Sequence, residues 1–275
     1  MYCQFYGLKE RPFNVTADPA FFFASRIHRE ALSHLIYGAS QRKGIMVLTG
    51  EIGTGKTTLC RFFLNRLGKN TRTALILNPY FSEIELLEAI VRDFGLIPPD
   101  KTRLSLVFEL NKFLLSESQK CNNIILIIDE AQNLKSHMLE QIRLLSNLET
   151  DKQKLLQVVL VAQPELNRIL SLYELRQLRQ RITVRYHIAP LQSDEIKNYV
   201  NHRLNVAGSS GKIRFTDEAV GAITEFSAGT PRLINIICDR ALLAGFVEET
   251  HTIGFDIVKK CLQELNSYFV GENIK

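Results

Sequence analysis

Gly50-Glu-Ile-Gly-Thr-Gly55-Lys56-Thr57 fits the pattern Gly-x-x-x-x-Gly-Lys-Ser/Thr without a mismatch. A run of apolar and β-branched residues at 45–49 precedes it, and a helical pattern begins at Lys56 and continues to about residue 67. A strand, a glycine-rich turn and a helix in this order place main-chain N–H groups around a phosphate. The competing interpretation, a chance glycine-rich turn, does not explain why both flanking elements are in place.

We expect this loop to hold the phosphates of a nucleotide. Lys56 can reach the β- and γ-phosphates, and the hydroxyl of Thr57 can bind Mg²⁺. The candidate phosphate-binding residues are the loop and the start of its helix: Gly50, Glu51, Ile52, Gly53, Thr54, Gly55, Lys56, Thr57 and Thr58.

Strand and helix patterns alternate from residue 44 to about 190. The apolar run Ile124–Ile128 suits a central strand that is buried on both faces. Ser82 followed by Glu85 is typical of a helix start. The pattern predicts an α/β core with a parallel sheet. Its further expected strands are 73–78, 157–162 and 183–188, and its further helices are 82–94, 103–118, 136–149 and a stretch after 162.

The pattern changes after Pro190, where helices follow one another and we expect no strand. We therefore predict two domains: residues 1–190 form an N-terminal arm with the α/β nucleotide-binding core, and residues 191–275 form a small all-helical domain. The helices expected there are 193–206, 216–227, 231–248 and 256–265.

Two adjacent carboxylates, Asp129 and Glu130, follow the buried strand. Ligands bind at the carboxyl ends of parallel strands, and carboxylates there are costly unless they are used. We expect Asp129 to hold Mg²⁺ and Glu130 to polarise the water that attacks the γ-phosphate. A solvated acidic turn is the alternative for this pair.

Two further candidates concern the γ-phosphate. Gln163 follows the predicted strand 157–162 and could orient the attacking water, unless it is only the polar start of a loop. Arg176, Arg179 and Arg181 lie just before the last core strand. An arginine from a neighbouring subunit can stabilise transition-state charge, and we favour Arg181, then Arg179. A solvated helix face would show the same run of arginines.

Gly229-Thr-Pro-Arg232 opens the longest predicted helix of the C-terminal region. Proline suits the first helical turn, and Thr230 could cap it. Arg232 could then reach the γ-phosphate and couple the nucleotide state to the angle between the domains. An ordinary helix start with an exposed arginine is the alternative.

Composition limits the classes that remain. The chain has 275 residues, with 45% apolar and 23% charged residues and a net charge of +5. It is therefore globular, and its mild basicity permits nucleic-acid binding without requiring it. Its five cysteines form no Cys-x-x-Cys pair, and no apolar run reaches 18 residues. We expect a cytoplasmic protein, with attachment to the inner face of the inner membrane through a missing anchor or partner as the alternative.

Taken together in this order, these motifs resemble those of the AAA+ ATPases. The resemblance identifies them with the phosphate loop, the metal-binding and water-activating carboxylates, the first sensor, the arginine finger and the second sensor of that family. It also implies that the helices after Pro190 form the family's lid domain and that the protein is a Mg²⁺-dependent ATPase.

The N-terminus resembles the general secretion pathway protein A (ExeA-type) family. The matching segments are Phe5-Tyr-Gly-Leu-Lys-Glu-Arg-Pro-Phe13, Asp18-Pro-Ala-Phe-Phe22, Ser25-x-x-His28-x-Glu-Ala-Leu32, Tyr37-Gly38, Asp129-Glu-Ala-Gln-Asn-Leu134 and Ala162-Gln-Pro-Glu-Leu166. The resemblance implies adenine contacts by Phe13, by Asp18, Pro19 and Phe21, and by His28. Packing on the core is the alternative for Phe21, Phe22 and Phe23.

Members of that family with the secretion role carry a transmembrane helix and a peptidoglycan-binding domain after the ATPase, whereas this sequence stops at Lys275. We expect either a cytoplasmic fragment or a shorter relative. The favoured function is an ATP-driven factor that assembles a secretion or pilus machine as a ring-like homo-oligomer. A DNA-binding regulator resembling transposition ATPases and a nucleotide-dependent scaffold with little turnover are the alternatives.

Overall fold

The computed structural model describes residues 1–149 and 153–271. It divides into two compact units: unit 1 comprises Met1–Ile27, Gly53–Gly55 and Ala189–Lys275, and unit 2 comprises His28–Ile52 and Lys56–Ile188. The N-terminal residues group with the C-terminal helices, whereas the domain boundaries inferred from the sequence separate them. Those boundaries stay a prediction.

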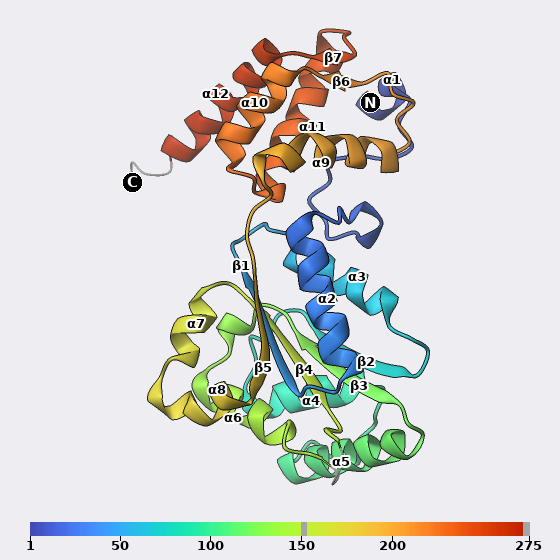
Figure 1. Cartoon of the computed structure of the whole chain (residues 1–275), viewed down its shortest axis with the longest axis vertical. Coiled ribbons are helices and arrows are strands. Elements are labelled where there is room, and N and C mark those ends of the chain that lie inside the picture. Colours follow the sequence, from blue (N-terminus) through green and yellow to red (C-terminus); the bar gives the residue numbers. More distant parts are fainter. Residues whose placement is uncertain (150–152, 272–275) are drawn as a thin grey trace. The chain divides into compact units, whose positions relative to one another are not determined.

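Unit 2 contains a five-stranded parallel sheet in the order β2-β3-β4-β1-β5 (Figure 1). All residues of β1 and β4 are buried, which explains why these segments read as continuous apolar runs. The parallel α/β core predicted from the sequence is confirmed. The strands are β1 (Ile45–Gly50), β2 (Thr71–Ile76), β3 (Asn123–Ile128), β4 (Gln157–Ala162) and β5 (Ile182–Ile188).

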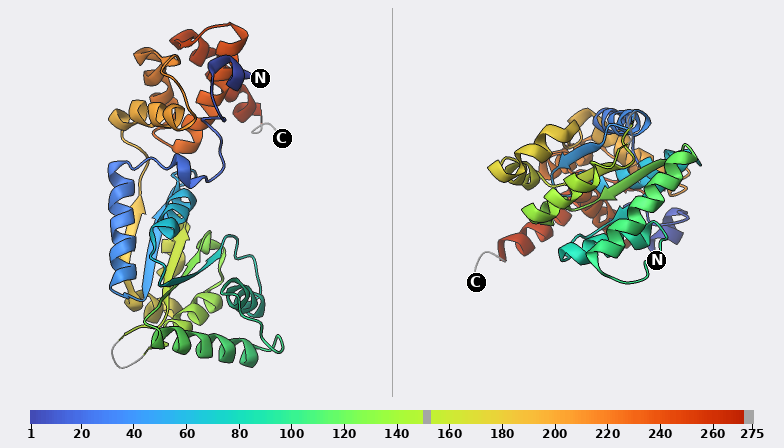
Figure 2. Two further views of the ribbon diagram at one scale, coloured as in Figure 1. Left: turned by 90° about the vertical axis from the view of Figure 1, so that its right-hand side faces the viewer. Right: turned by 90° about the horizontal axis from the view of Figure 1, so that it is seen from below.

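Helices pack against both faces of this sheet (Figure 2). Val47 of β1 belongs to an apolar cluster that includes side chains of α4, α5, α6 and α7. Met46 faces the other way, toward α2, where a Cβ on Gly38 would lie only 2.1 Å from the Met46 sulfur. The helices are α2 (Arg26–Ser40, in unit 2 from His28), α3 (Lys56–Arg66), α4 (Glu83–Asp93), α5 (Arg103–Gln119), α6 (Ser136–Leu145), α7 (Glu165–Leu170) and α8 (Arg176–Arg181), with short 3-10 turns η2 (Ala131–Asn133) and η3 (Tyr173–Leu175).

Three predicted elements differ from the structure by two residues or more: the strand 73–78, the helix 136–149 and the helix 256–265, which continues to Gly271 in α12. β2 begins and ends two residues before the predicted strand because its pairing with β3 starts at Thr71 and Asn123. The helix predicted over 136–149 ends at Leu145, since Glu149 instead pairs with Lys154 in an isolated antiparallel bridge. The capping box at Ser82 and Glu85 is present as expected.

Unit 1 is mainly helical, with α1 (Tyr2–Tyr6), η1 (Pro19–Phe21), α9 (Ser193–Val206), α10 (Asp217–Ser227), α11 (Pro231–Val247) and α12 (Phe255–Gly271). The expectation that no strand follows Pro190 is wrong in one detail. β6 (Arg214–Phe215) and β7 (Thr252–Ile253) form a parallel pair. Two residues are too few to give a strand pattern in the sequence.

The N-terminal residues of unit 1 are fixed by Arg203 of α9. Its guanidinium group donates to the carbonyl oxygens of Pro12 (2.5 Å) and Asn14 (3.0 Å) and lies over the ring of Phe21. Only 6% of Arg203 is exposed, so these carbonyls satisfy a buried charge. This arm is therefore part of the core of unit 1.

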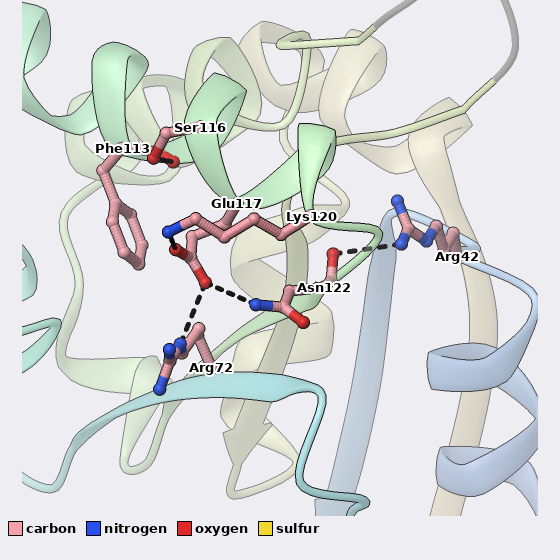
Figure 3. Close-up of polar contacts among 7 residues, drawn as sticks. All are labelled: Arg42, Arg72, Phe113, Ser116, Glu117, Lys120 and Asn122. Carbon is pink, nitrogen blue, oxygen red and sulfur yellow. Dashed lines mark hydrogen bonds and ion pairs between the residues drawn. The ribbon is translucent and has the colours of Figure 1, made fainter.

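A buried carboxylate fixes the end of unit 2 where the strands begin. Glu117 of α5 accepts hydrogen bonds from Lys120 (2.7 Å), Asn122 (2.7 Å) and Arg72 (2.9 Å), as Figure 3 shows. Arg42 in turn donates to the carbonyl oxygen of Asn122 at 3.0 Å. These contacts connect the end of α5 to the beginning of β2 and to the residue before β3.

These donors lower the pKa of Glu117 to about 2. A carboxylate whose folded pKa is depressed stabilises the fold above its unfolded pKa of about 4.3, and this contribution is lost as the pH falls toward 2. We expect Glu117→Gln to reduce the free energy of unfolding by about 1–3 kcal/mol at pH 7. Urea denaturation should show that the difference in free energy of unfolding between wild type and Glu117→Gln becomes smaller between pH 5 and pH 2.5. Glu109→Gln on the same helix is the control. A difference between wild type and Glu117→Gln that does not change with pH would contradict the prediction.

Candidate functional site

Three neighbouring strands of unit 2 end in polar residues at one edge of the sheet. In the register of the sheet Ile128 pairs with Leu160, and Ala162 pairs with Thr49. The residues that follow these strand ends are Asp129 and Glu130 after β3, Gln163 after β4, and the glycine-rich loop after β1. Parallel pairing therefore brings together groups that are far apart in the sequence.

The glycine-rich loop follows β1 and leads into α3. Gly53 (φ 81°) and Gly55 (φ 91°) adopt backbone conformations that favour glycine. The side chains of Glu51 and Ile52 are exposed, whereas Thr54 is buried. Thr58 is partly buried on the first turn of α3.

Lys56 is held by its own loop. Its ammonium group donates to the carbonyl oxygens of Gly50 (2.8 Å) and Glu51 (2.9 Å), and only 6% of the residue is exposed. Burial lowers the pKa of Lys56, while the charges of Glu130 and Asp129 act in the opposite direction. An ammonium group has three protons, so the third is available for a phosphate oxygen.

Thr57 donates its hydroxyl proton to Asp129 at 2.5 Å. Asp129 is 2% exposed, and burial raises the pKa of its carboxyl group despite the hydrogen bonds from Thr57 and the main chain of Glu130. Within residues 1–149 and 153–271, no cluster of three or more histidine, cysteine or acidic residues could cage a metal. Two adjacent oxygen donors fit Mg²⁺, which takes its remaining ligands from water and phosphates.

Glu130 lies in a strained turn at the end of β3. Its φ of 53° falls in the left-handed region, which non-glycine residues adopt at a cost of about 1–3 kcal/mol and mainly at functional sites. Its carboxylate accepts a hydrogen bond from the side chain of Gln163 at 3.1 Å. The structure thus places Gln163 beside Glu130, and the roles assigned to both residues stay predictions.

The arginines of α8 lie at the other end of the strands. Arg181 directly precedes β5, whose first residue pairs with Ile45 at the start of β1. Gly50 lies five residues further along β1, or roughly 16–17 Å from that level. Arg181 therefore lies too far from the phosphate loop to complete it within the same chain. Arg179 donates to the carbonyl oxygen of Ser171 at 3.3 Å.

The remaining candidates are placed as follows. In unit 1, Arg232 is the second residue of α11, and its main-chain N–H donates to the carbonyl oxygen of Gly53 at 3.2 Å. Phe13 is 1% exposed and packs edge-on against Phe215. His28, in unit 2, is 4% exposed. Adenine contacts by Phe13 and His28 stay predictions.

Gln132 is a residue of the site that was not predicted from the sequence. Its side-chain nitrogen donates to the carboxylate of Glu130, and its side-chain oxygen accepts from the main-chain N–H of Gln163 at 3.0 Å. Its place two residues after Glu130, within the segment 129–134 that resembles the secretion family, is the signal in the sequence that could have pointed to it. Another unforeseen contact joins Thr49 of β1 to the ring of His187 at 3.1 Å.

A family model described as an AAA domain matches residues 39–170. These residues form an AAA domain. A general secretion pathway protein A from Aeromonas hydrophila is 49% identical over 255 residues. That match covers 92% of this chain, so the resemblance inferred from the sequence is confirmed, but the chain spans only 46% of that relative's length.

Solved structures share the AAA fold at lower sequence identity. The Aeropyrum pernix ORC2 protein, in ADPNP–ADP complexes, matches with a TM-score of 0.67 and 18% identity over 87% of this chain and 68% of that one. Cdc6p from Pyrobaculum aerophilum matches with a TM-score of 0.67 and 21% identity over 90% of this chain and 71% of that one. In the part of our chain that the structure describes, every helix falls short of the length and apolar content needed to cross a bilayer.

Because burial raises the pKa of Asp129, its ionised form costs folding free energy at neutral pH. We expect Asp129→Asn to stabilise the nucleotide-free protein by about 0.5–2 kcal/mol at pH 7. The gain should shrink as the pH falls toward the ordinary aspartate pKa of about 3.9, because below that pH Asp129 is protonated in both the folded and the unfolded state. Urea denaturation at pH 7 and pH 4 measures the gain in stability and its decrease with falling pH.

Asp100→Asn is the matched control for this prediction. Hydrogen bonds from Thr102 lower the pKa of Asp100, so its replacement should reduce stability rather than increase it. A loss of stability in Asp129→Asn at pH 7 would contradict the account of this carboxylate.

Proposed function

We propose that this chain binds ATP with Mg²⁺ and hydrolyses it to ADP and phosphate. The observation that carries the proposal is the convergence of Lys56, Thr57, Asp129, Glu130 and Gln163 at the carboxyl ends of three adjacent strands. An AAA domain over residues 39–170 supports it. The arrangement costs folding free energy, since it buries a carboxylate and strains a non-glycine residue.

The loop and Lys56 bind and orient the triphosphate. Thr57 and Asp129 hold Mg²⁺, which when bound neutralises charge on the phosphate oxygens. Glu130 takes a proton from water, and the water oxygen bonds to the γ-phosphorus. The bond from that phosphorus to the bridging oxygen breaks, and its electron pair leaves with ADP. Gln163 hydrogen-bonds the water or the γ-phosphate.

An arginine from a second copy of the chain completes the site. Arg181, and next to it Arg179, lies near the amino ends of the strands and so cannot serve the loop of its own chain. A neighbouring subunit in a homo-oligomer could present this residue to the γ-phosphate. Arg232 of α11 acts in this scheme as the sensor that couples the nucleotide state to the helical part of the chain, and Phe13 and His28 contact the adenine.

The cellular role that we propose is ATP-driven assembly or remodelling of a cell-envelope secretion machine, of the type II or pilus-like kind, at the cytoplasmic side of the inner membrane. It rests on the 49% identity to a protein named general secretion pathway protein A. Because the chain spans 46% of that relative, the comparison bears on only that part of the relative.

A DNA-binding regulator is the second candidate. One observation favours it: Arg168, Arg176, Arg179 and Arg185 are all exposed on unit 2 of a chain with a net charge of +5. Such arginines could bind phosphates of duplex DNA, with an affinity that falls steeply as salt rises. Stimulation of phosphate release by duplex DNA would favour this candidate over the secretion role.

Phosphate release measured against protein concentration tests the proposal. The rate per subunit should rise with concentration, because each site needs its neighbour. Glu130→Gln should lower the maximal rate by about 100-fold or more, since it removes the general base. Equal rates for wild type and Glu130→Gln would leave the chain a nucleotide-dependent scaffold and contradict the proposed hydrolysis.

Mixing two inactive variants tests the shared site. Glu130→Gln subunits retain Arg181, and Arg181→Ala subunits retain Glu130, so a hybrid interface holds one complete site. An equal mixture should recover about a quarter of the wild-type rate if subunits exchange at random. The same mixture is made with Arg179→Ala in place of Arg181→Ala. If neither mixture releases phosphate faster than the sum of its two components, interface catalysis is contradicted.

A further inference from the structure

Gln132 joins two groups of the candidate site that come from different strands. It belongs to the 3-10 turn Ala131–Asn133, which directly follows Glu130. The turn is anchored in the core of unit 2 by Ala131 and Leu134, both nearly fully buried. Gln132 itself is partly buried, and its side chain reaches both the carboxylate of Glu130 and the end of β4.

The orientation of this amide is fixed by its partners. An ionised carboxylate only accepts hydrogen bonds, so the nitrogen of Gln132 must face Glu130. The main-chain N–H of Gln163 only donates, so the oxygen of Gln132 must face it, at 3.0 Å. One side chain therefore uses its donor and its acceptor at once. An amide is the group that matches both neighbours.

The side chain of Gln163 adds a second bond to the same carboxylate oxygen. Its nitrogen donates to Oε2 of Glu130 at 3.1 Å, and the nitrogen of Gln132 donates to that oxygen too. Two donors on Oε2 set the plane of the carboxylate and direct Oε1 to take the proton from water. They also hold in place a residue whose φ of 53° is strained.

We propose that Gln132 is a positioning residue that fixes the carboxylate of Glu130 relative to Gln163 for attack on the γ-phosphate. The inference rests on the proposed ATP hydrolysis. Gln132 acts through Glu130 rather than on the nucleotide. Its loss should therefore lower kcat and leave ATP binding nearly unchanged.

Two replacements separate its two contacts. Gln132→Met keeps the length of the side chain and removes both hydrogen bonds. Gln132→Glu keeps an acceptor for the N–H of Gln163 but places a second carboxylate against Glu130. Gln119→Met and Gln119→Glu are the controls, at an exposed position at the end of α5, beside the amino ends of the strands.

Both Gln132 variants should lower kcat for ATP at pH 8 by about tenfold or more, with KM changed less than about threefold. In a Glu130→Gln background, Gln132→Met should cost almost nothing more.

Wild-type kcat in Gln132→Met, or a full further loss in the Glu130→Gln background, would overturn the inference. Failure of the proposed function looks different: wild type and Glu130→Gln would then release phosphate equally, whatever the state of residue 132.

Discussion

The register of β3, β4 and β1 is the constraint on which the candidate site depends. Ile128 pairs with Leu160, and Leu160 with Val47, so Asp129 and Gln163 emerge at the same edge as the glycine-rich loop. A slip of one residue in β3 would turn Asp129 away from Thr57 and break their 2.5 Å hydrogen bond. The buried apolar side chains of these strands fix the register on both faces of the sheet.

At that edge the fold accepts two local costs. Asp129 is an almost fully buried carboxylate whose pKa burial raises, and Glu130 has a left-handed backbone. At the opposite end, Glu117 is also buried, but three donors lower its pKa and make it stabilising. The two carboxylates differ in their partners: three side chains donate to Glu117, whereas Asp129 accepts from Thr57 and the main chain of Glu130. Asp129, whose buried charge has fewer donors, lies where a bound cation would offset the cost of that charge.

The parts of the fold that were predictable have short-range signals. The apolar runs around Leu126 and Leu160 and the glycine-rich loop each fix an element without knowledge of its partners. The neighbourhood of Gln163 and Glu130 followed from parallel pairing alone. The contacts that could not be predicted depend on distant partners. Gln132 is hydrogen-bonded to a residue 31 positions later, and Arg203 to residues 189 and 191 positions earlier. The two-residue strands β6 and β7 are too short for any periodicity.

The central claim is that the loop and Lys56 bind the triphosphate of ATP, and calorimetric titration of ATP with Mg²⁺ tests it most directly. The account predicts saturable binding to wild type and binding about 100-fold weaker or more to Lys56→Ala, because a charge-assisted contact worth about 2.7 kcal/mol is lost. Lys69→Ala, at an exposed position, should bind like wild type. Equal affinity of Lys56→Ala and wild type, with both proteins folded, would contradict the account.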